Sequence, residues 1–199
     1  MPRPVIYYVR HGLTDWNVAQ RLQGDCDTPI NAEGRAQARR CGEILGELLA
    51  RDSRAPANLD YVSSPLVRAR ATMELMRSAL GLDPSDYDID PRLAEISFGE
   101  WDGLTYAEVM ARDKDVLAQR EADKWAFVPP AGESYAEVAR RIGEWCDALR
   151  GDSVVAAHGG TARALLAHLA IVPPREAPHY SIDQGVVYVF ADNRIARYR

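Results

Sequence analysis

Residues 5–12 read VIYYVRHG, a short apolar stretch that ends in an arginine, a histidine and a glycine. The β-branched and aromatic residues from Val5 to Val9 favour a buried strand, and the polar residues that follow end it. Residues 153–160, SVVAAHGG, have the same design, with His158 at the end of a second apolar strand. Two strands of this kind in one chain predict a sheet with functional residues at the edge where these strands end.

Segments with helical spacing of apolar residues separate these strands. Asn31 is a suitable N-cap for a helix, and Ser64 with Pro65 is expected to begin another after a strand over residues 59–63. Further helices are expected after a capping box at residues 134–137 and after His158. The C-terminal part predicts two more strands, over residues 186–190 and 195–198. The alternation predicts an α/β fold, a three-layer α/β/α sandwich with a largely parallel central sheet.

Length and composition narrow the class of protein. The 199 residues suit a single compact domain over residues 1–199, and the net charge of −5 argues against a general nucleic-acid-binding face. No segment has the roughly 20 apolar residues that a membrane span needs. The apolar run that starts at Val5 is too short for the core of a secretory signal peptide. Three cysteines without paired spacing indicate neither a disulfide framework nor a zinc site. We therefore expect a cytoplasmic protein without nucleic-acid or membrane partners, either a monomer or a homodimer.

The strand ends are where chemistry is expected, because ligands of open α/β sheets bind at the carboxyl ends of the strands. His11 and His158 would both lie there, next to Arg10 and close to a helix that carries Arg68 in its first turn. Two arginines and two histidines converging on one point suit a phosphoryl group, whose oxygens need cationic partners with several N–H donors.

These residue types also suggest roles in catalysis. One histidine of such a pair can act as a covalent nucleophile, while the other holds phosphate oxygens. A leaving alkoxide then needs a proton, which a carboxylic acid near the phosphate can supply. Glu95 and Glu100 are both candidates for this acid, and the residues alone do not decide between them.

Four motifs in order give the chain a resemblance to a known family. Residues 10–12 (RHG) with Thr14, Asn17 and the segment up to residue 38 form the first, and residues 63–72 (SSPLVRARAT) form the second. Residues 93–103 (LAEISFGEWDG) form the third and residues 157–159 (AHG) the last. In order and spacing they closely resemble the histidine phosphatase (phosphoglycerate mutase-like) superfamily, from about residue 5 to about residue 170.

The resemblance implies a role for each matching residue. His11 corresponds to the residue that becomes phosphorylated, and Glu95 corresponds to the proton donor, which favours it over Glu100. The residues that correspond to the family's phosphate pocket are Arg10, Asn17, Arg68 and His158. The resemblance implies an enzyme acting on a small phosphorylated metabolite with no metal ion and no organic cofactor. It also implies that residues 104–135 form a lid over the active site.

The leading hypothesis for function is a phosphatase that hydrolyses small phosphomonoesters through phosphohistidine. A phosphoglycerate mutase-type transfer is the nearest alternative. Mutases of this family tend to carry an Asn-Glu-Arg-His-Tyr-Gly run where this chain has residues 94–99 (AEISFG), which favours a phosphatase. A catalytically silent binder of phosphorylated ligands is the third hypothesis, and intact His11 and Glu95 argue against it.

Several other residues have more ordinary interpretations. Arg70 is expected in a surface or interhelical ion pair, His168 on a helix face and His179 in a loop. The physiological substrate and the role of Glu100 stay open at this level. No Cys-x5-Arg loop, no G-x-S-x-G elbow and no G-x-x-x-x-G-K-[ST] loop occurs in the chain, which removes three other routes to phosphate or acyl chemistry.

Overall fold

A computed structural model describes residues 3–199, and in it six strands form one sheet in the order β3-β2-β4-β1-β5-β6. The strands are β1 (Ile6–Arg10), β2 (Asp60–Ser63), β3 (Asp88–Ile89), β4 (Ser153–Ala157), β5 (Val187–Ala191) and β6 (Arg194–Tyr198). The first four run parallel, whereas β5 pairs antiparallel with β1, and β6 pairs antiparallel with β5 at one edge of the sheet. The prediction of an α/β fold with a largely parallel sheet is confirmed.

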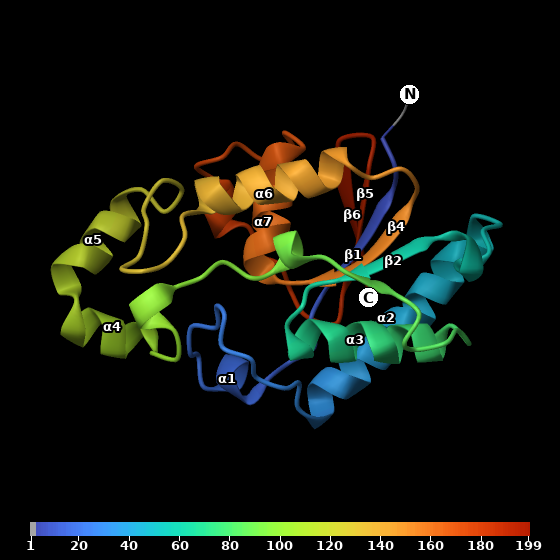
Figure 1. Cartoon of the computed structure of the whole chain (residues 1–199), viewed down its shortest axis with the longest axis horizontal. Coiled ribbons are helices and arrows are strands. Elements are labelled where there is room, and N and C mark those ends of the chain that lie inside the picture. The colour runs from blue at the N-terminus through green and yellow to red at the C-terminus, as the bar shows by residue number, and fades with distance from the viewer. Residues whose placement is uncertain (1–2) are drawn as a thin grey trace.

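Helices cover both faces of this sheet (Figure 1), because successive side chains of each strand point to opposite sides. Ile6 and Tyr8 of β1 belong to the core under α6 (Tyr135–Asp147) and α7 (Gly159–His168), whereas Tyr7 and Val9 belong to the core under α2 (Ala32–Arg51) and α3 (Val67–Ala79). The α-helices are α1 (Asp15–Val18), α2 (Ala32–Arg51), α3 (Val67–Ala79), α4 (Tyr106–Arg112), α5 (Lys114–Ala122), α6 (Tyr135–Asp147) and α7 (Gly159–His168). The short 3-10 helices are η1 (Pro56–Asn58), η2 (Pro91–Leu93), η3 (Gly99–Trp101) and η4 (Ala177–His179).

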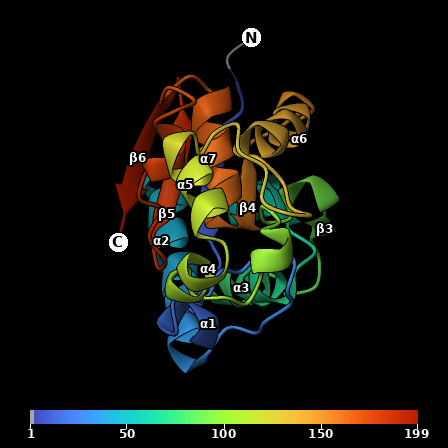
Figure 2. The same cartoon turned by 90° about the vertical axis from the view of Figure 1, so that its left-hand side faces the viewer.

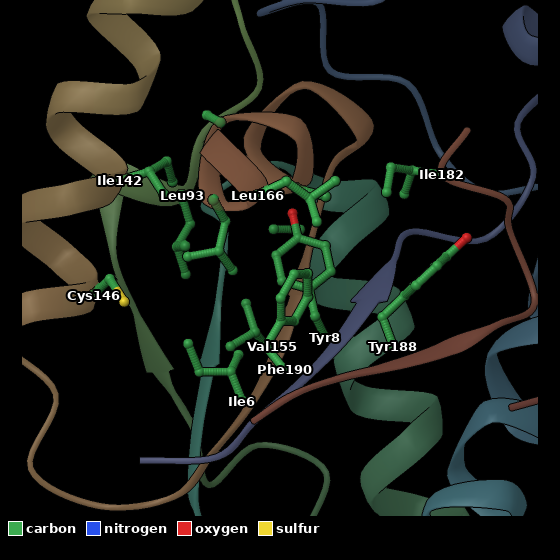
Figure 3. Close-up of a cluster of buried hydrophobic side chains, with 14 of the residues drawn as sticks. Ile6, Tyr8, Leu93, Ile142, Cys146, Val155, Leu166, Ile182, Tyr188 and Phe190 are labelled. Carbon is green, nitrogen blue, oxygen red and sulfur yellow. The ribbon is translucent and has the colours of Figure 1, made fainter. Parts of the chain in front are cut away.

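The larger of the two cores lies between the sheet and α6 with α7. Figure 3 shows Ile6, Tyr8, Val155 and Phe190 of the strands facing side chains from these helices. The rings of Tyr8 and Phe190 meet edge to face, with centroids 6.1 Å apart. This packing fixes β1 and β4, the two strands that end in histidine, as neighbours in the middle of the sheet.

One predicted helix start is wrong. The helix expected to begin at Ser64 and Pro65 begins at Val67, with Leu66 as its N-cap residue. Ser64 instead lies between β2 and the helix, and its hydroxyl accepts a hydrogen bond from the Leu66 amide at 3.3 Å. Residue 66 therefore takes the extended conformation that an N-cap residue requires, and the helix starts two residues later than the Ser-Pro signal indicates.

The predicted C-terminal hairpin is present. Asp192 and Asn193 join β5 to β6 and both have positive φ, of 49° and 56°, as a two-residue type I′ turn requires. The segment between η3 and α6 carries α4 and α5, which lie away from the sheet (Figure 1) and in front of it when that side faces the viewer (Figure 2). Within residues 3–199, no helix combines the length and the apolar character needed to cross a bilayer.

Candidate functional site

The two histidines that follow strands lie next to each other. β1 and β4 pair in parallel with Arg10 opposite Ala157, so the residues that follow them, His11 and His158, leave the sheet at the same edge. Their ring centroids are 5.3 Å apart, and both side chains are almost fully buried. The structure therefore brings the histidines together as the sequence predicts.

Two arginines complete this group. The Arg10 guanidinium donates to the Ile182 carbonyl at 2.9 Å. Arg68 reaches back from the first turn of α3 and donates to the carbonyls of Cys26 and Gly24, at 2.8 Å each. Both guanidinium groups are thus held in place by the backbone of other segments before any ligand binds.

Three nitrogens in this group have no partner. Among the side-chain atoms of residues 3–199, the buried nitrogens or oxygens without a hydrogen bond are Arg10 Nε, Arg68 Nε and His158 Nδ1. Buried polar groups are otherwise nearly always paired, because an unmade hydrogen bond costs about 1–3 kcal/mol. Three such atoms gathered beside His11 make a site for an anion with several oxygen atoms.

His11 is arranged as a nucleophile. Its Nδ1 lies 2.8 Å from the carbonyl oxygen of Gly12, so Nδ1 carries the hydrogen and Nε2 keeps the lone pair. Burial, together with the nearby Arg10 and Arg68, lowers the pKa of His11 well below its usual value. Burial and the Arg68 charge act in the same direction on the pKa of His158. Both rings are therefore neutral at neutral pH, and His11 presents a free electron pair.

The lowered pKa of His11 should be visible in its titration. A depressed pKa means that His11 keeps its lone pair as the pH falls through about 6.5, where an ordinary histidine becomes protonated. In the free enzyme, the ring-carbon signal of His11 should therefore show no titration step near that pH. Nuclear magnetic resonance of histidine-labelled protein measures this, and the His11→Ala spectrum assigns the signal. A midpoint at or above about 6.5 would contradict the neutral nucleophile.

Asn17 is oriented toward the same site by its neighbours. Its Oδ1 accepts hydrogen bonds from the backbone and hydroxyl of Thr14, at 3.2 and 3.1 Å, and from Gln184 at 2.8 Å. With Oδ1 fully used, the amide nitrogen of Asn17 is the group left to donate to a ligand. Gln184 also donates to the His11 carbonyl at 3.2 Å. Gln184 could not be recognised from the sequence, because nothing in the local pattern before β5 distinguishes it.

The structure separates the two candidate carboxylates. Glu95 is buried, and its oxygens accept hydrogen bonds from the amides of Ile96 at 2.9 Å and Gly160 at 3.2 Å. Gly160 permits this approach, since a Cβ there would collide with the Glu95 carboxylate. Glu100 is exposed and lies 3.9 Å from Arg112 in a surface ion pair. Only Glu95 therefore lies at the edge of the sheet that carries His158.

The residues given ordinary interpretations lie outside the site. Arg70 is exposed and donates to the Tyr87 hydroxyl at 3.4 Å, and His179 is exposed in η4. His168, the last residue of α7, pairs with Asp147 at 3.1 Å. Trp101 is buried in a small core with Val109 and Leu117, through which α4 and α5 pack against η3.

Comparison with known proteins agrees with this geometry. The family model of the histidine phosphatase superfamily (branch 1) matches residues 6–194. The chain is 38% identical over 184 residues to a glucosyl-3-phosphoglycerate phosphatase of Mycobacterium tuberculosis, covering 85% of this chain and 77% of the relative. It is 31% identical over 195 residues to a 2,3-bisphosphoglycerate-dependent phosphoglycerate mutase of Gloeobacter violaceus, covering 94% and 84%. The structure of a mycobacterial glucosyl-3-phosphoglycerate phosphatase superimposes with a TM-score of 0.77 at 32% identity, covering 94% of this chain and 89% of that one. The chain belongs to the histidine phosphatase superfamily, branch 1.

Proposed function

We propose that this protein is a phosphatase that hydrolyses small-molecule phosphomonoesters through a phosphohistidine at His11. The observation that carries the proposal is the set of unpartnered nitrogens of Arg10, Arg68 and His158 beside the free Nε2 of His11. A phosphoryl group offers each of these nitrogens an oxygen acceptor and offers Nε2 an electrophilic phosphorus. No metal ion is needed to neutralise its charge, because the two guanidinium groups already do so.

The proposed reaction has two steps. His11 Nε2 attacks phosphorus, the bond to the ester oxygen breaks, and protonated Glu95 gives its proton to the departing oxygen. A water molecule then attacks the phosphohistidine, Glu95 accepts a proton from that water, and inorganic phosphate leaves. Arg10, Arg68, His158 and Asn17 hold the phosphoryl oxygens throughout. Because the carboxyl group ends in its starting protonation state, the cycle is balanced.

The substrate proposed is a small, polar phosphorylated metabolite. Two relatives described above act, by name, on phosphoglycerate derivatives, one as a phosphatase and one as a mutase. Residues 104–135, which we propose to be a lid, carry mixed charges and the aromatic residues Tyr106, Trp125 and Phe127. We propose that the protein acts in the cytoplasm as a monomer or homodimer, without a nucleic-acid or membrane partner.

The direct test is phosphate release from p-nitrophenyl phosphate and from a panel of phosphorylated metabolites in excess EDTA. Release that persists in EDTA supports a metal-independent phosphatase. Isomerisation of 3-phosphoglycerate without net phosphate release would instead assign a mutase. Binding of phosphate esters without either reaction would instead assign a catalytically silent binder of phosphorylated ligands.

Substitution of Glu95 tests the proton donor. Glu95→Gln keeps the shape of the side chain but removes the transferable proton, so the loss should depend on the leaving group. We expect a loss on the order of 10²-fold for alkyl phosphates and a much smaller loss for p-nitrophenyl phosphate, whose leaving oxygen needs no proton. Glu100→Gln, on the exposed side of η3, is the matched control and should leave both rates unchanged. Equal losses on the two substrates would contradict the role of Glu95.

A further inference from the structure

Arg141 of α6 makes an unusually complete set of contacts. Its Nε donates to Glu133 Oε1 at 3.0 Å, and one terminal nitrogen donates to Glu133 Oε2 at 2.9 Å. The same terminal nitrogen reaches the Glu95 carbonyl at 3.2 Å. The other terminal nitrogen donates to the carbonyls of Arg92 at 2.5 Å and Ala94 at 2.7 Å. All five N–H groups of the guanidinium thus have an acceptor.

Three of these acceptors are backbone carbonyls in, or just before, the segment that carries Glu95. Residues 94–98, between η2 and η3, belong to no helix or strand. The backbone there therefore depends on other groups to fix its conformation. Arg141 binds the carbonyl of Glu95 and those of two residues before it, so it holds the backbone from which the Glu95 carboxylate projects.

Glu133 ties this clamp to the end of the segment over residues 104–135. The Glu133 amide donates to the Ser97 carbonyl at 2.9 Å, and the Ser97 amide donates to Glu133 Oε2 at 3.3 Å. Nearby, the Glu100 amide donates to the Pro130 carbonyl at 2.9 Å. Residues 97–100 and 130–133 therefore lie against each other, and the position of one constrains the other.

The clamp borders a cleft at the surface of the protein. Glu95, Glu133 and Arg141 all line a cleft of about 400 Å³. Because every N–H group of Arg141 is already used within the protein, Arg141 has no free donor for a ligand in this cleft. Its influence on a ligand there passes through the groups that it holds.

We propose that Arg141 is a positioning residue for Glu95, and that its ion pair with Glu133 couples the proton donor to residues 104–135. This inference rests on the proposed function, since it assigns Arg141 a role in proton transfer to the leaving group. Arginine is required because its planar fork reaches five acceptors in fixed directions, whereas lysine offers one nitrogen with three N–H groups. A displaced Glu95 would still carry its proton but would meet the leaving oxygen with poor geometry.

The test compares Arg141→Lys with Arg140→Lys, a substitution at the neighbouring exposed arginine of the same helix. Arg141→Lys should lower kcat for an alkyl phosphate on the order of 10-fold and change p-nitrophenyl phosphate hydrolysis by less than about 2-fold. KM should change little for either substrate. Arg140→Lys should leave all of these values unchanged.

A double mutant separates positioning from a general structural role. In the Glu95→Gln background, where no proton can be donated, Arg141→Lys should cause little further loss, because both changes remove the same step. Equal losses on both substrates, or losses that multiply in the double mutant, would overturn the proposal. If Arg141→Lys does not fold, as shown by its thermal unfolding, Glu133→Gln decides the question. It weakens the same clamp and should produce the same dependence on the leaving group.

The wild-type protein keeps this test distinct from that of the proposed function. A folded wild type without phosphatase activity on any substrate overturns the proposed function, and with it the reaction in which Arg141 would take part. An active wild type whose Arg141→Lys variant loses both substrates equally overturns only the positioning role.

Discussion

The His11→Ala variant should lose phosphatase activity by a factor on the order of 10⁵, or to background, the scale expected when a covalent nucleophile is removed. Alanine leaves no atom that can attack phosphorus. The nearby His158 cannot replace it, because its Nε2 is held 2.7 Å from the Ser64 hydroxyl. Phosphate binding should decline far less than turnover, since Arg10, Arg68 and His158 are all retained.

Trapping the phosphorylated enzyme gives this prediction a second measurement. Wild type that is incubated with labelled substrate and then denatured at alkaline pH, where the P–N bond of phosphohistidine survives, should carry one phosphoryl group, and peptide mapping at alkaline pH should place it on His11. The His11→Ala protein should carry none. His168→Ala, which removes a histidine that contacts Asp147 at the end of α7, outside the site, is the control and should trap label as the wild type does. Label retained in His11→Ala would show that another residue is the nucleophile.

The convergence of the site was predictable from sequence because it follows from strand direction. Arg10 and Ala157 end two parallel strands, and residues that follow parallel strands emerge at one edge of a sheet. Apolar stretches such as residues 5–9 and 153–157 indicate strands clearly, since they are short, contain β-branched residues and are followed by polar residues. The family resemblance then supplied the roles, including the preference for Glu95.

The parts that could not be predicted depend on contacts between distant segments. Glu95 and Glu100 are five residues apart in one irregular stretch, and no periodicity tells which of them is buried. The turn at Gly99, with φ of 56°, brings the Pro130 carbonyl so close that a Cβ there would collide with it. This packing places Glu100 outside and leaves Glu95 inside.

Two residues that hold parts of the site in place could not be recognised from the sequence for the same reason. Gln184 reaches Asn17 across 167 positions of sequence, and Arg141 reaches the Glu95 carbonyl across 46. Both were ordinary polar residues in the sequence. Their partners are mostly backbone carbonyls and an amide oxygen, and such partners leave no signature in the residues around them.

Arg68→Lys is expected to lower kcat/KM on the order of 10²-fold, the scale of losing one preorganised electrostatic donor. The positive charge remains, so the prediction concerns geometry. The guanidinium binds the carbonyls of Gly24 and Cys26 with its two terminal nitrogens and leaves Nε for the ligand. A lysine ammonium at the end of a flexible chain cannot make both carbonyl contacts and still present a donor in the same direction.

The matched control for this substitution is on the same helix. Arg77 of α3 is also buried, donates to the Asp83 carbonyl at 2.7 Å, and lies over the Tyr61 ring at 4.3 Å, outside the phosphate site. Arg77→Lys should lower thermal stability but keep kcat/KM within about 2-fold of wild type, as a change remote from the reacting groups does.

Arg68→Lys should lower kcat/KM and also weaken inhibition by inorganic phosphate. Near-normal kinetics and phosphate affinity in Arg68→Lys would remove Arg68 from the phosphate site. Equal kinetic losses in both variants would mean that the effect comes from destabilising α3. The comparison therefore distinguishes an arginine that binds phosphate from one that supports the helix.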